Sequence, residues 1–443
     1  MIKVGFISLG CSKNLVDTEV MLHILEENGC EIVAEDIDAD VIIVNTCAFI
    51  ESAKREAIDN ILDVAWLKKH RKLKGIVVTG CLVERYREEV MKEMPEIDAI
   101  VGVGSIQKIY EAVESAYNKK KYVSIEDKNT CPLGGDRVLI GDGASGCLKI
   151  AEGCDNCCTY CAIPLIRGRF RSRPMEDLVE EAKKLEQSGI KELNIIAQDT
   201  TRYGLDLYGQ YSLARLVREI SKATNIPWIR LLYCYPDKIT DDLIDEMKTN
   251  PRLLHYIDLP IQHINDKILK RMNRHGSGEL IKSNIEKLRR EVPDIVIRST
   301  VIVGFPGETE EEFSELCEYV KSAGFTHLGA FTYSREEGTP AAEFEDQIDE
   351  QTKQDRYEII MEEQYRVVEE KNNSKIGKEY DVLVEGYDVV SESYYGRSYE
   401  NAPEVDGQVY FTAPAKGLNP GDFCKVRIND IIDYDLVGEI IAK

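Results

Sequence analysis

Short apolar runs alternate with helical patterns through the first 117 residues of the chain. Strand-like runs occupy residues 4–9, 41–44, 76–79 and 99–101, and helical patterns occupy 15–27, 53–67, 83–94 and 106–117. Alternation of this kind predicts a parallel sheet covered by helices, and near-continuous apolar strands fit a sheet buried on both faces. We therefore expect an N-terminal doubly wound parallel-sheet domain over residues 1–130.

A second βα series follows a polar, glycine-containing linker expected at residues 131–146. Its predicted strands are 148–151, 193–197, 228–233, 256–259, 296–303 and 328–333, followed by a charged helix over 350–374. Six strands with intervening helices predict a partial (β/α)6 barrel over residues 147–375. Such barrels carry their active sites on the loops at the carboxyl ends of the strands.

Residues 376–443 are rich in Val, Tyr and Ile and are interrupted by Gly and Pro turns, which predicts a small all-β domain. The whole chain is therefore of the α/β class. Residues 378–443 hold six basic and thirteen acidic side chains, a net charge of −7, and the whole chain carries −23. Such acidity disfavours DNA or tRNA as the partner, because nucleic-acid binding displaces counterions with basic side chains. It suits a basic protein partner.

Thirteen cysteines are present, an odd number that excludes a complete disulfide framework. No apolar run reaches the roughly 18 residues that span a bilayer. The N-terminus lacks the pattern of a signal peptide. We expect a cytoplasmic protein, and because disulfides rarely persist in that compartment, the cysteines indicate metal or redox chemistry.

Four cysteines fall within eight positions: Cys154, Cys157, Cys158 and Cys161. Cys154, Cys158 and Cys161 form CxxxCxxC, which suits three corners of a [4Fe–4S] cluster with one iron open to a small molecule. All four form CxxCCxxC, which suits a zinc site. Structural zinc sites usually combine two separated CxxC segments, so the missing spacer favours the cluster and makes Cys157 a bystander.

Three more cysteines, Cys11, Cys47 and Cys81, each follow a predicted strand of the N-terminal domain by one to three residues. The carboxyl edge of an open parallel sheet forms its ligand crevice, so these thiols are expected to converge there. The alternative is ordinary packing, because cysteine is often buried. Their position in loops favours a joint metal or cluster site with one open iron.

CxxxCxxC with Tyr160 before its last cysteine resembles the radical S-adenosylmethionine (SAM) superfamily, which implies reductive cleavage of SAM to a 5′-deoxyadenosyl radical and makes Tyr160 an expected contact of SAM. The two cysteine triplets, in this order, resemble the methylthiotransferases, which implies two [4Fe–4S] clusters and a C-terminal TRAM-like domain. Three segments resemble the RimO branch: Ser8–Asp17, Pro260–His263 and Ala402–Gly407. Ser12 departs from that branch, where proline is more usual.

The RimO resemblance implies methylthiolation of the β-carbon of an aspartate in small-subunit ribosomal protein twelve. SAM would serve as both radical source and methyl donor, and a flavodoxin-like protein would supply electrons. A tRNA adenosine methylthiotransferase is the nearest alternative. A zinc-binding adaptor without catalysis is the alternative from another class.

Further candidates have two interpretations each. Gln198, after the second barrel strand, is expected to bind the methionine part of SAM or to solvate a loop. Arg298, within the fifth strand, is expected to bind a carboxylate or to pair with a structural acid. Gly304 suits backbone approach to adenosine or a tight turn. His263 suits catalysis or a structural hydrogen bond, and the alternating Arg167, Arg169, Arg171 and Arg173 suit carboxylate or ion pairing or RNA contact.

Overall fold

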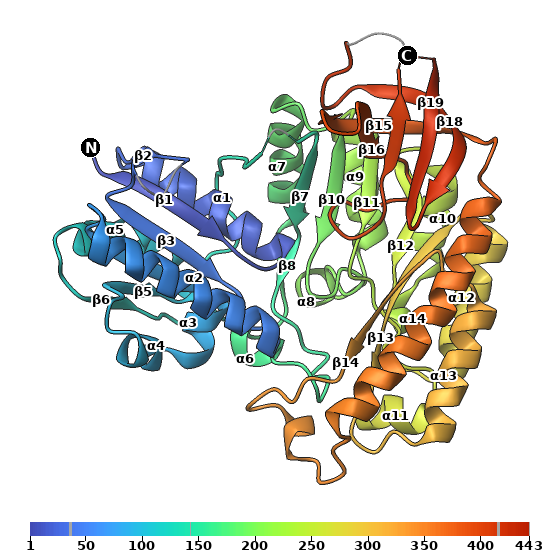
Figure 1. Cartoon of the computed structure of the whole chain (residues 1–443), viewed down its shortest axis with the longest axis horizontal. Coiled ribbons are helices and arrows are strands. Elements are labelled where there is room, and N and C mark those ends of the chain that lie inside the picture. The colour runs from blue at the N-terminus through green and yellow to red at the C-terminus, as the bar shows by residue number, and fades with distance from the viewer. Residues whose placement is uncertain (35–37, 142, 414–416, 443) are drawn as a thin grey trace. The chain divides into compact units, whose positions relative to one another are not determined.

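The computed structural model in Figure 1 describes residues 1–34, 38–141, 143–413 and 417–442. Residue 142 of the predicted linker and residues 414–416 and 443 of the predicted β domain lie outside the described residues. The chain divides into two compact units. The first, here called the cysteine unit, comprises Met1–Ile140, Ala151–Arg173 and Ser334–Ala342. The second, the barrel unit, comprises Gly141–Ile150, Pro174–Tyr333 and Glu343–Lys443.

The cysteine unit contains a six-stranded parallel sheet in the order β2-β1-β3-β4-β5-β6. Its strands are β1 (Lys3–Ser8), β2 (Glu31–Ile32), β3 (Val41–Thr46), β4 (Gly75–Gly80), β5 (Ala99–Val101) and β6 (Tyr122–Ser124). Its helices include α1 (Ser12–Glu27), α2 (Glu51–His70), α3 (Cys81–Tyr86), α4 (Glu88–Glu93) and α5 (Ile109–Tyr117). The expected parallel-sheet fold is confirmed.

The central strands β3 and β4 are buried along their whole length, as their unbroken apolar runs predict. Two apolar clusters, one containing Ile42 and the other Ile43, hold the helices to the sheet. The helix expected over 83–94 divides at Arg87, whose φ of 52° interrupts α-helical geometry. The edge strands β2 and β6 were not predicted, because they are very short and only partly apolar.

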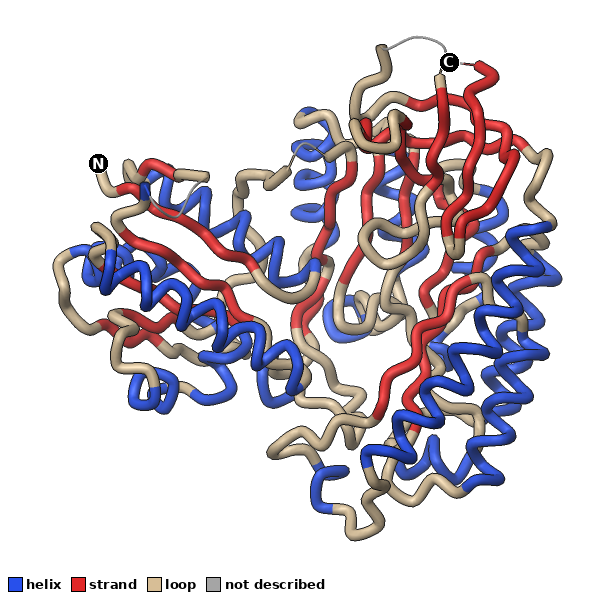
Figure 2. The backbone as a smooth tube through the Cα atoms, in the orientation of Figure 1, coloured by secondary structure: helices blue, strands red, loops and turns tan. Residues whose placement is uncertain are grey.

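The barrel unit contains a second parallel sheet of six strands, in the order β14-β13-β12-β11-β10-β7. Strands are drawn in red and helices in blue in Figure 2. The strands are β7 (Ser145–Lys149), β10 (Glu192–Ile196), β11 (Trp228–Leu231), β12 (Leu253–Asp258), β13 (Val296–Val303) and β14 (His327–Thr332). The main helices are α7 (Met175–Gln187), α9 (Leu213–Ala223), α10 (Asp241–Thr249), α12 (Gly278–Glu291), α13 (Glu310–Ala323) and α14 (Glu350–Asn373). The predicted partial (β/α)6 barrel is confirmed.

The C-terminal residues form a closed five-stranded barrel, as expected for a small all-β domain. Its strands are β15 (Glu379–Asp388), β16 (Ser393–Arg397), β17 (Val409–Thr412), β18 (Phe423–Ile432) and β19 (Asp435–Ala442). Its core includes Val382, Phe411 and Val426. Elsewhere, none of the helices in the described ranges combines the length and apolar character that crossing a bilayer requires.

A buried carboxylate joins the β domain to the first residues of the barrel strands. Glu192 of β10 accepts from Arg230 Nε at 2.7 Å and from Arg397 Nη2 of β16 at 2.5 Å. Burial alone would raise the pKa of Glu192, but Arg397 and Arg230 lower it to about 2. The carboxylate is therefore ionised and fully paired at neutral pH.

Replacing Glu192 with Gln should lower the free energy of unfolding by about 3 kcal/mol, because two buried guanidinium groups lose their shared anion. The folded carboxyl titrates below its ordinary value of 4.5, so its stabilisation is complete above pH 4.5 and disappears as the pH falls toward 2. Chemical unfolding over this window should show less loss of stability in Glu192→Gln than in the natural chain. The matched control is Glu379→Gln, since Glu379 forms an exposed pair with Arg427 at 3.0 Å and should cost under about 1 kcal/mol.

Candidate active site

The three strand-end cysteines lie in neighbouring loops at the carboxyl edge of the first sheet. Cys11 immediately precedes α1, Cys47 follows the last residue of β3, and Cys81 begins α3. Asn14 holds the first two loops together, because its Nδ2 donates to Leu9 O at 2.7 Å and to Thr46 O at 3.2 Å. The strand edge therefore gathers thiols that are far apart in the sequence.

A buried hydroxyl joins the second and third of these loops. Thr46 Oγ1 donates to Thr79 O at 2.5 Å and accepts from the backbone N–H of Leu82 at 3.3 Å. Thr46 precedes Cys47, and Leu82 follows Cys81, so this bond fixes both cysteines relative to each other. Asn14 and Thr46 were missed at the sequence level, although a polar residue that ends an otherwise apolar strand could have indicated Thr46.

Two glycines allow the loops to approach so closely. Gly10 has a φ of 93°, and a Cβ there would lie 2.8 Å from Cys47 Cβ. Gly80 has a φ of 91°, and a Cβ there would collide with the side chain of Asn45 and the backbone of Thr46. Each glycine directly precedes a cysteine, so the loops can be neither bulkier nor differently bent without moving a thiol.

The second triplet lies in the loop between the short strand β8 (Ala151–Glu152) and α6 (Ile163–Arg167), which belongs to the cysteine unit. The backbone N–H of Cys154 donates to Gly168 O at 3.1 Å, and that of Cys161 donates to Cys158 O at 3.0 Å. Cys158 is buried, Cys154 and Cys161 are half-buried, and Cys157 is exposed with a φ of 49°. The turn therefore separates Cys157 from the other three in exposure and backbone conformation.

The loop of the second triplet packs directly on the first. Ala162 and Ile166 share one apolar cluster with Cys81, Leu82 and Val83. The two triplets thus belong to one packed body, with α6 against α3.

Arg167, the last residue of α6, follows the second triplet in the chain and bonds to the first. It is 3% exposed, and its Nη1 donates to Asp17 Oδ2 at 2.6 Å and to Glu152 Oε2 at 3.4 Å. Its Nη2 donates to Asn14 Oδ1 at 2.9 Å and to Cys81 Sγ at 3.6 Å. Of the two interpretations of the arginine series, buried ion pairing is therefore the one that Arg167 fulfils.

Burial dominates the protonation of the strand-end thiols. It raises the pKa of Cys81 to about 12 against the opposing effect of Arg167, and it also raises the pKa of Cys47. At Cys11 burial is outweighed by Lys13 and Arg167, and the pKa is lowered. Cys11 and Cys47 also raise the pKa of Cys81, so three thiolates together require a bound cation.

The cysteines of this chain are present as thiols. All thirteen cysteines lie in the described ranges, and none of them forms a disulfide. Among the described residues, no three Cys, His, Asp or Glu side chains come close enough to ligate one metal ion.

A segment that sequence reasoning missed contacts both cysteine loops. Within Ser334–Ala342, Glu336 accepts from Arg85 Nη1 at 2.8 Å and from the backbone N–H of Glu51 at 3.0 Å. Arg85 also donates to Ala48 O, beside Cys47, and the N–H of Ala341 donates to Thr159 O in the second loop. The segment therefore contacts both the loop that holds Cys47 and the loop of the second triplet.

The expected SAM-contacting residues divide between the two units. Tyr160 is half-buried in the second cysteine loop, whereas Gln198, Arg298 and Gly304 belong to the barrel unit. Gln198 lies just beyond the carboxyl end of β10, as expected. The structure places it among the strand-end loops without identifying its ligand.

Arg298 and Gly304 each have structural partners in the barrel unit. Arg298 pairs with Asp258 and with the buried Asp406 of the β domain, each at 3.3 Å, which agrees with the expected pairing with a structural acid, while its contact with the cofactor stays a prediction. The backbone N–H of Gly304 donates to Glu308, which also bonds His263 Nε2 at 3.3 Å and Arg356 Nη1 at 2.9 Å. Gly304 thus forms a tight turn with its donor engaged, and His263 is a structural histidine.

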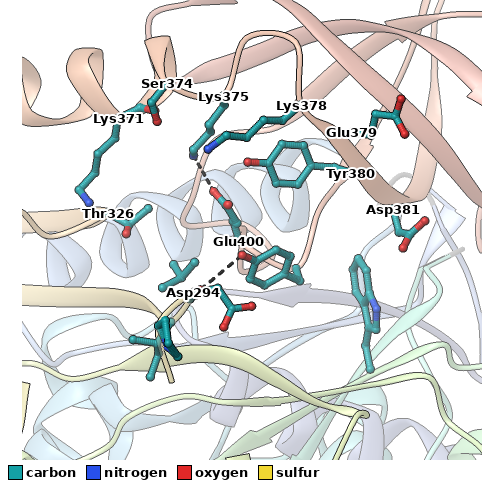
Figure 3. Close-up of a pocket in the computed structure, with 15 residues that line it drawn as sticks. Asp294, Thr326, Lys371, Ser374, Lys375, Lys378, Glu379, Tyr380, Asp381 and Glu400 are labelled. Atoms are coloured by element: carbon teal, nitrogen blue, oxygen red, sulfur yellow. Dashed lines mark hydrogen bonds and ion pairs between the residues drawn. The ribbon is translucent and has the colours of Figure 1, made fainter. Parts of the chain in front are cut away.

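A cavity of about 530 Å³ in the barrel unit lies away from these strand ends (Figure 3). It is lined by Trp228 and Val296, which begin β11 and β13, and by residues of the β domain such as Tyr380. Lys375 and Glu400 form an ion pair within it at 2.6 Å. Because Gln198 and Gly304 follow the opposite ends of their strands, this cavity and these two residues lie at opposite ends of the barrel-unit sheet.

Three family models match the chain: the uncharacterized protein family UPF0004 over residues 3–102, the Radical SAM superfamily over 148–320 and the TRAM domain over 376–441. Similar relatives include the ribosomal protein uS12 methylthiotransferase RimO of Acetivibrio thermocellus, which is 49% identical over 449 residues and covers 100% of this chain and 99% of the relative. RimO of Clostridium perfringens is 50% identical over 440 residues, covering 99% and 98%. This chain belongs to the RimO family. The family predicted from the two triplets is confirmed, and with it the methylthiotransferase class.

Solved structures support the fold of this RimO-family chain. The radical SAM methyltransferase TsrM of Kitasatospora setae superposes with a TM-score of 0.57 at 15% identity and covers 76% of each chain. The cobalamin-dependent radical enzyme OxsB superposes with a TM-score of 0.53 at 11% identity, covering 83% of this chain and 58% of OxsB. At such identities the likeness concerns the fold alone.

The close approach at Gly80 can be tested by adding a single methyl group. Gly80→Ala should lower the free energy of unfolding by about 3 kcal/mol, because the positive φ and the collision with Thr46 both oppose a Cβ. The matched control is Gly29→Ala, which has a φ of 77° but no described atom within 4 Å of its Cβ position. That control should cost about 1 kcal/mol in the same chemical unfolding experiment. Equal costs for the two variants would show that crowding at the strand edge is unimportant.

Proposed function

We propose that this chain is a radical SAM enzyme that attaches a methylthio group to an aspartate β-carbon of ribosomal protein uS12. Cys154, Cys158 and Cys161 would hold one [4Fe–4S] cluster and bind SAM at its open iron. Cys11, Cys47 and Cys81 would hold the second. The observation that carries the proposal is Arg167, which bonds Cys81 from a helix that begins two residues after Cys161.

The two clusters, when bound, supply reductive SAM cleavage and a site for the transferred sulfur. The chain itself holds the thiols in place through Asn14, Thr46 and Arg167, whose bonds leave the loops little freedom. Cys47, Cys81 and Cys158 are buried, Cys154 and Cys161 are half-buried, and Cys11 is exposed. Tyr160, beside Cys161, and Gln198 remain proposed contacts of SAM.

The acidic β domain supports a protein substrate over tRNA. Its net charge of −7 over residues 378–443 repels a phosphate backbone and attracts a basic ribosomal protein. The relatives of 49% and 50% sequence identity are named ribosomal protein uS12 methylthiotransferases, which supports the same choice of substrate. An external flavodoxin-like donor would supply the electrons for SAM cleavage.

The two triplets should separate two activities. Alanine at Cys154, Cys158 or Cys161 should abolish formation of 5′-deoxyadenosine, because SAM loses its iron. Alanine at Cys11, Cys47 or Cys81 should retain that product but yield no methylthiolated uS12. A variant in which all three cysteines of one triplet are Ala should keep half of the iron of the natural chain after anaerobic reconstitution. The product is measured by chromatography, the iron by chemical assay and the modification by mass spectrometry.

Cys157→Ala is the control for these variants, since Cys157 occupies the same loop but is exposed and outside the proposed ligand set. It should retain full iron and both products. Loss of half of the iron in Cys157→Ala would contradict the proposed ligand assignment.

Substrate choice is tested by incubating the reconstituted enzyme, SAM and reductant with uS12 and, separately, with unmodified tRNA. Mass spectrometry should detect the methylthio group on uS12 only. Modification of tRNA without modification of uS12 would favour the tRNA alternative. Stoichiometric zinc without iron or sulfide in anaerobically purified protein would favour the adaptor.

A further inference from the structure

Arg167 is placed to act on one cluster while its backbone belongs to the loop of the other. Its Nη2 lies 3.6 Å from Cys81 Sγ, within hydrogen-bonding distance of sulfur. Among the described contacts, Arg167 is thus a cationic donor to one thiol of the strand-end triplet.

The orientation of this guanidinium is fixed from several sides. Asp17 and Glu152 accept from Nη1, and Asn14 accepts from Nη2. Nη2 is thus the nitrogen whose described acceptors are Asn14 and the sulfur of Cys81. The planar fork of arginine allows these contacts together, whereas a lysine ammonium is a point charge on a flexible stem.

We propose that Arg167 is a positioning residue that raises the reduction potential of the cluster held by Cys11, Cys47 and Cys81. Hydrogen bonds to cluster sulfurs and nearby positive charge both stabilise the reduced form, which carries one more negative charge. This inference rests on the proposed function, in that it assumes the strand-end triplet holds a cluster.

The test uses the full chain in which Cys154, Cys158 and Cys161 are Ala, so that only the strand-end cluster contributes to the spectrum. A redox titration followed by electron paramagnetic resonance compares this background with the same background carrying Arg167→Gln. At a fixed potential, the ratio of reduced to oxidised cluster should fall at least tenfold, equivalent to about 59 mV for a one-electron couple. Arg167→Lys should give a smaller fall, because it keeps the charge but loses the fork.

Arg169→Gln is the matched control, since Arg169 is an exposed arginine that follows Arg167 by two residues, just beyond α6. It should leave the potential unchanged. Loss of Arg167 leaves Asp17 buried without its cation, so Arg167→Gln with Asp17→Asn provides a neutral pair in case the single variant does not fold. The double variant should show the same direction of shift.

An unchanged potential in a folded, iron-loaded Arg167 variant would overturn the proposal. So would failure of both the single and the double variant to bind iron while the background does, because Arg167 would then serve assembly. If the background itself binds no iron, the proposed ligand set fails instead. The two failures are thereby distinguishable.

Discussion

Parallel pairing of β1, β3 and β4 is the constraint on which the site depends. In this register Ser8 lies beside Asn45, and Asn45 beside Thr79, so the three strands end level with one another. The chain leaves each strand within three residues of a cysteine. Residues separated by more than thirty positions therefore meet at one edge, and no local motif is needed to bring them together. Gly10 and Gly80 complete this arrangement by removing the side chains that would hold the loops apart.

The polar groups that hold these loops are buried, and their cost is offset because they bond one another. Asn14, Thr46 and Arg167 each contact at least two loops, so removing any one leaves a buried donor or acceptor without its partner. The barrel unit uses the same principle at Glu192 and at Asp406, where single carboxylates satisfy several buried donors. Rigid placement of side chains, rather than extra apolar burial, is what these networks provide.

The sequence predicts the fold class and the two cysteine triplets because both depend on patterns along the chain. Apolar runs such as Val41–Thr46 can be recognised in the sequence alone. A cysteine that follows such a run must lie at the carboxyl edge of the parallel sheet. Contacts that depend on the direction of a side chain cannot be predicted from the sequence in this way. Arg298 could point to a cofactor or to an acid, and only the fold brings Asp406 to it across 108 positions. Glu336 was missed for the same reason, since nothing near it in the sequence indicates Arg85.

The composition of the cysteine unit from three separate segments has a consequence for biosynthesis. Arg85 and Glu336 are 251 positions apart, and both are almost completely buried in the finished structure. As the ribosome releases the chain from its N-terminus, the first sheet can pair long before the last segment emerges. Until then, the guanidinium of Arg85 and the loop beside Cys47 face solvent. A nascent chain is therefore exposed to premature thiol oxidation, and insertion of the metal groups into a finished enzyme must wait for nearly four-fifths of translation.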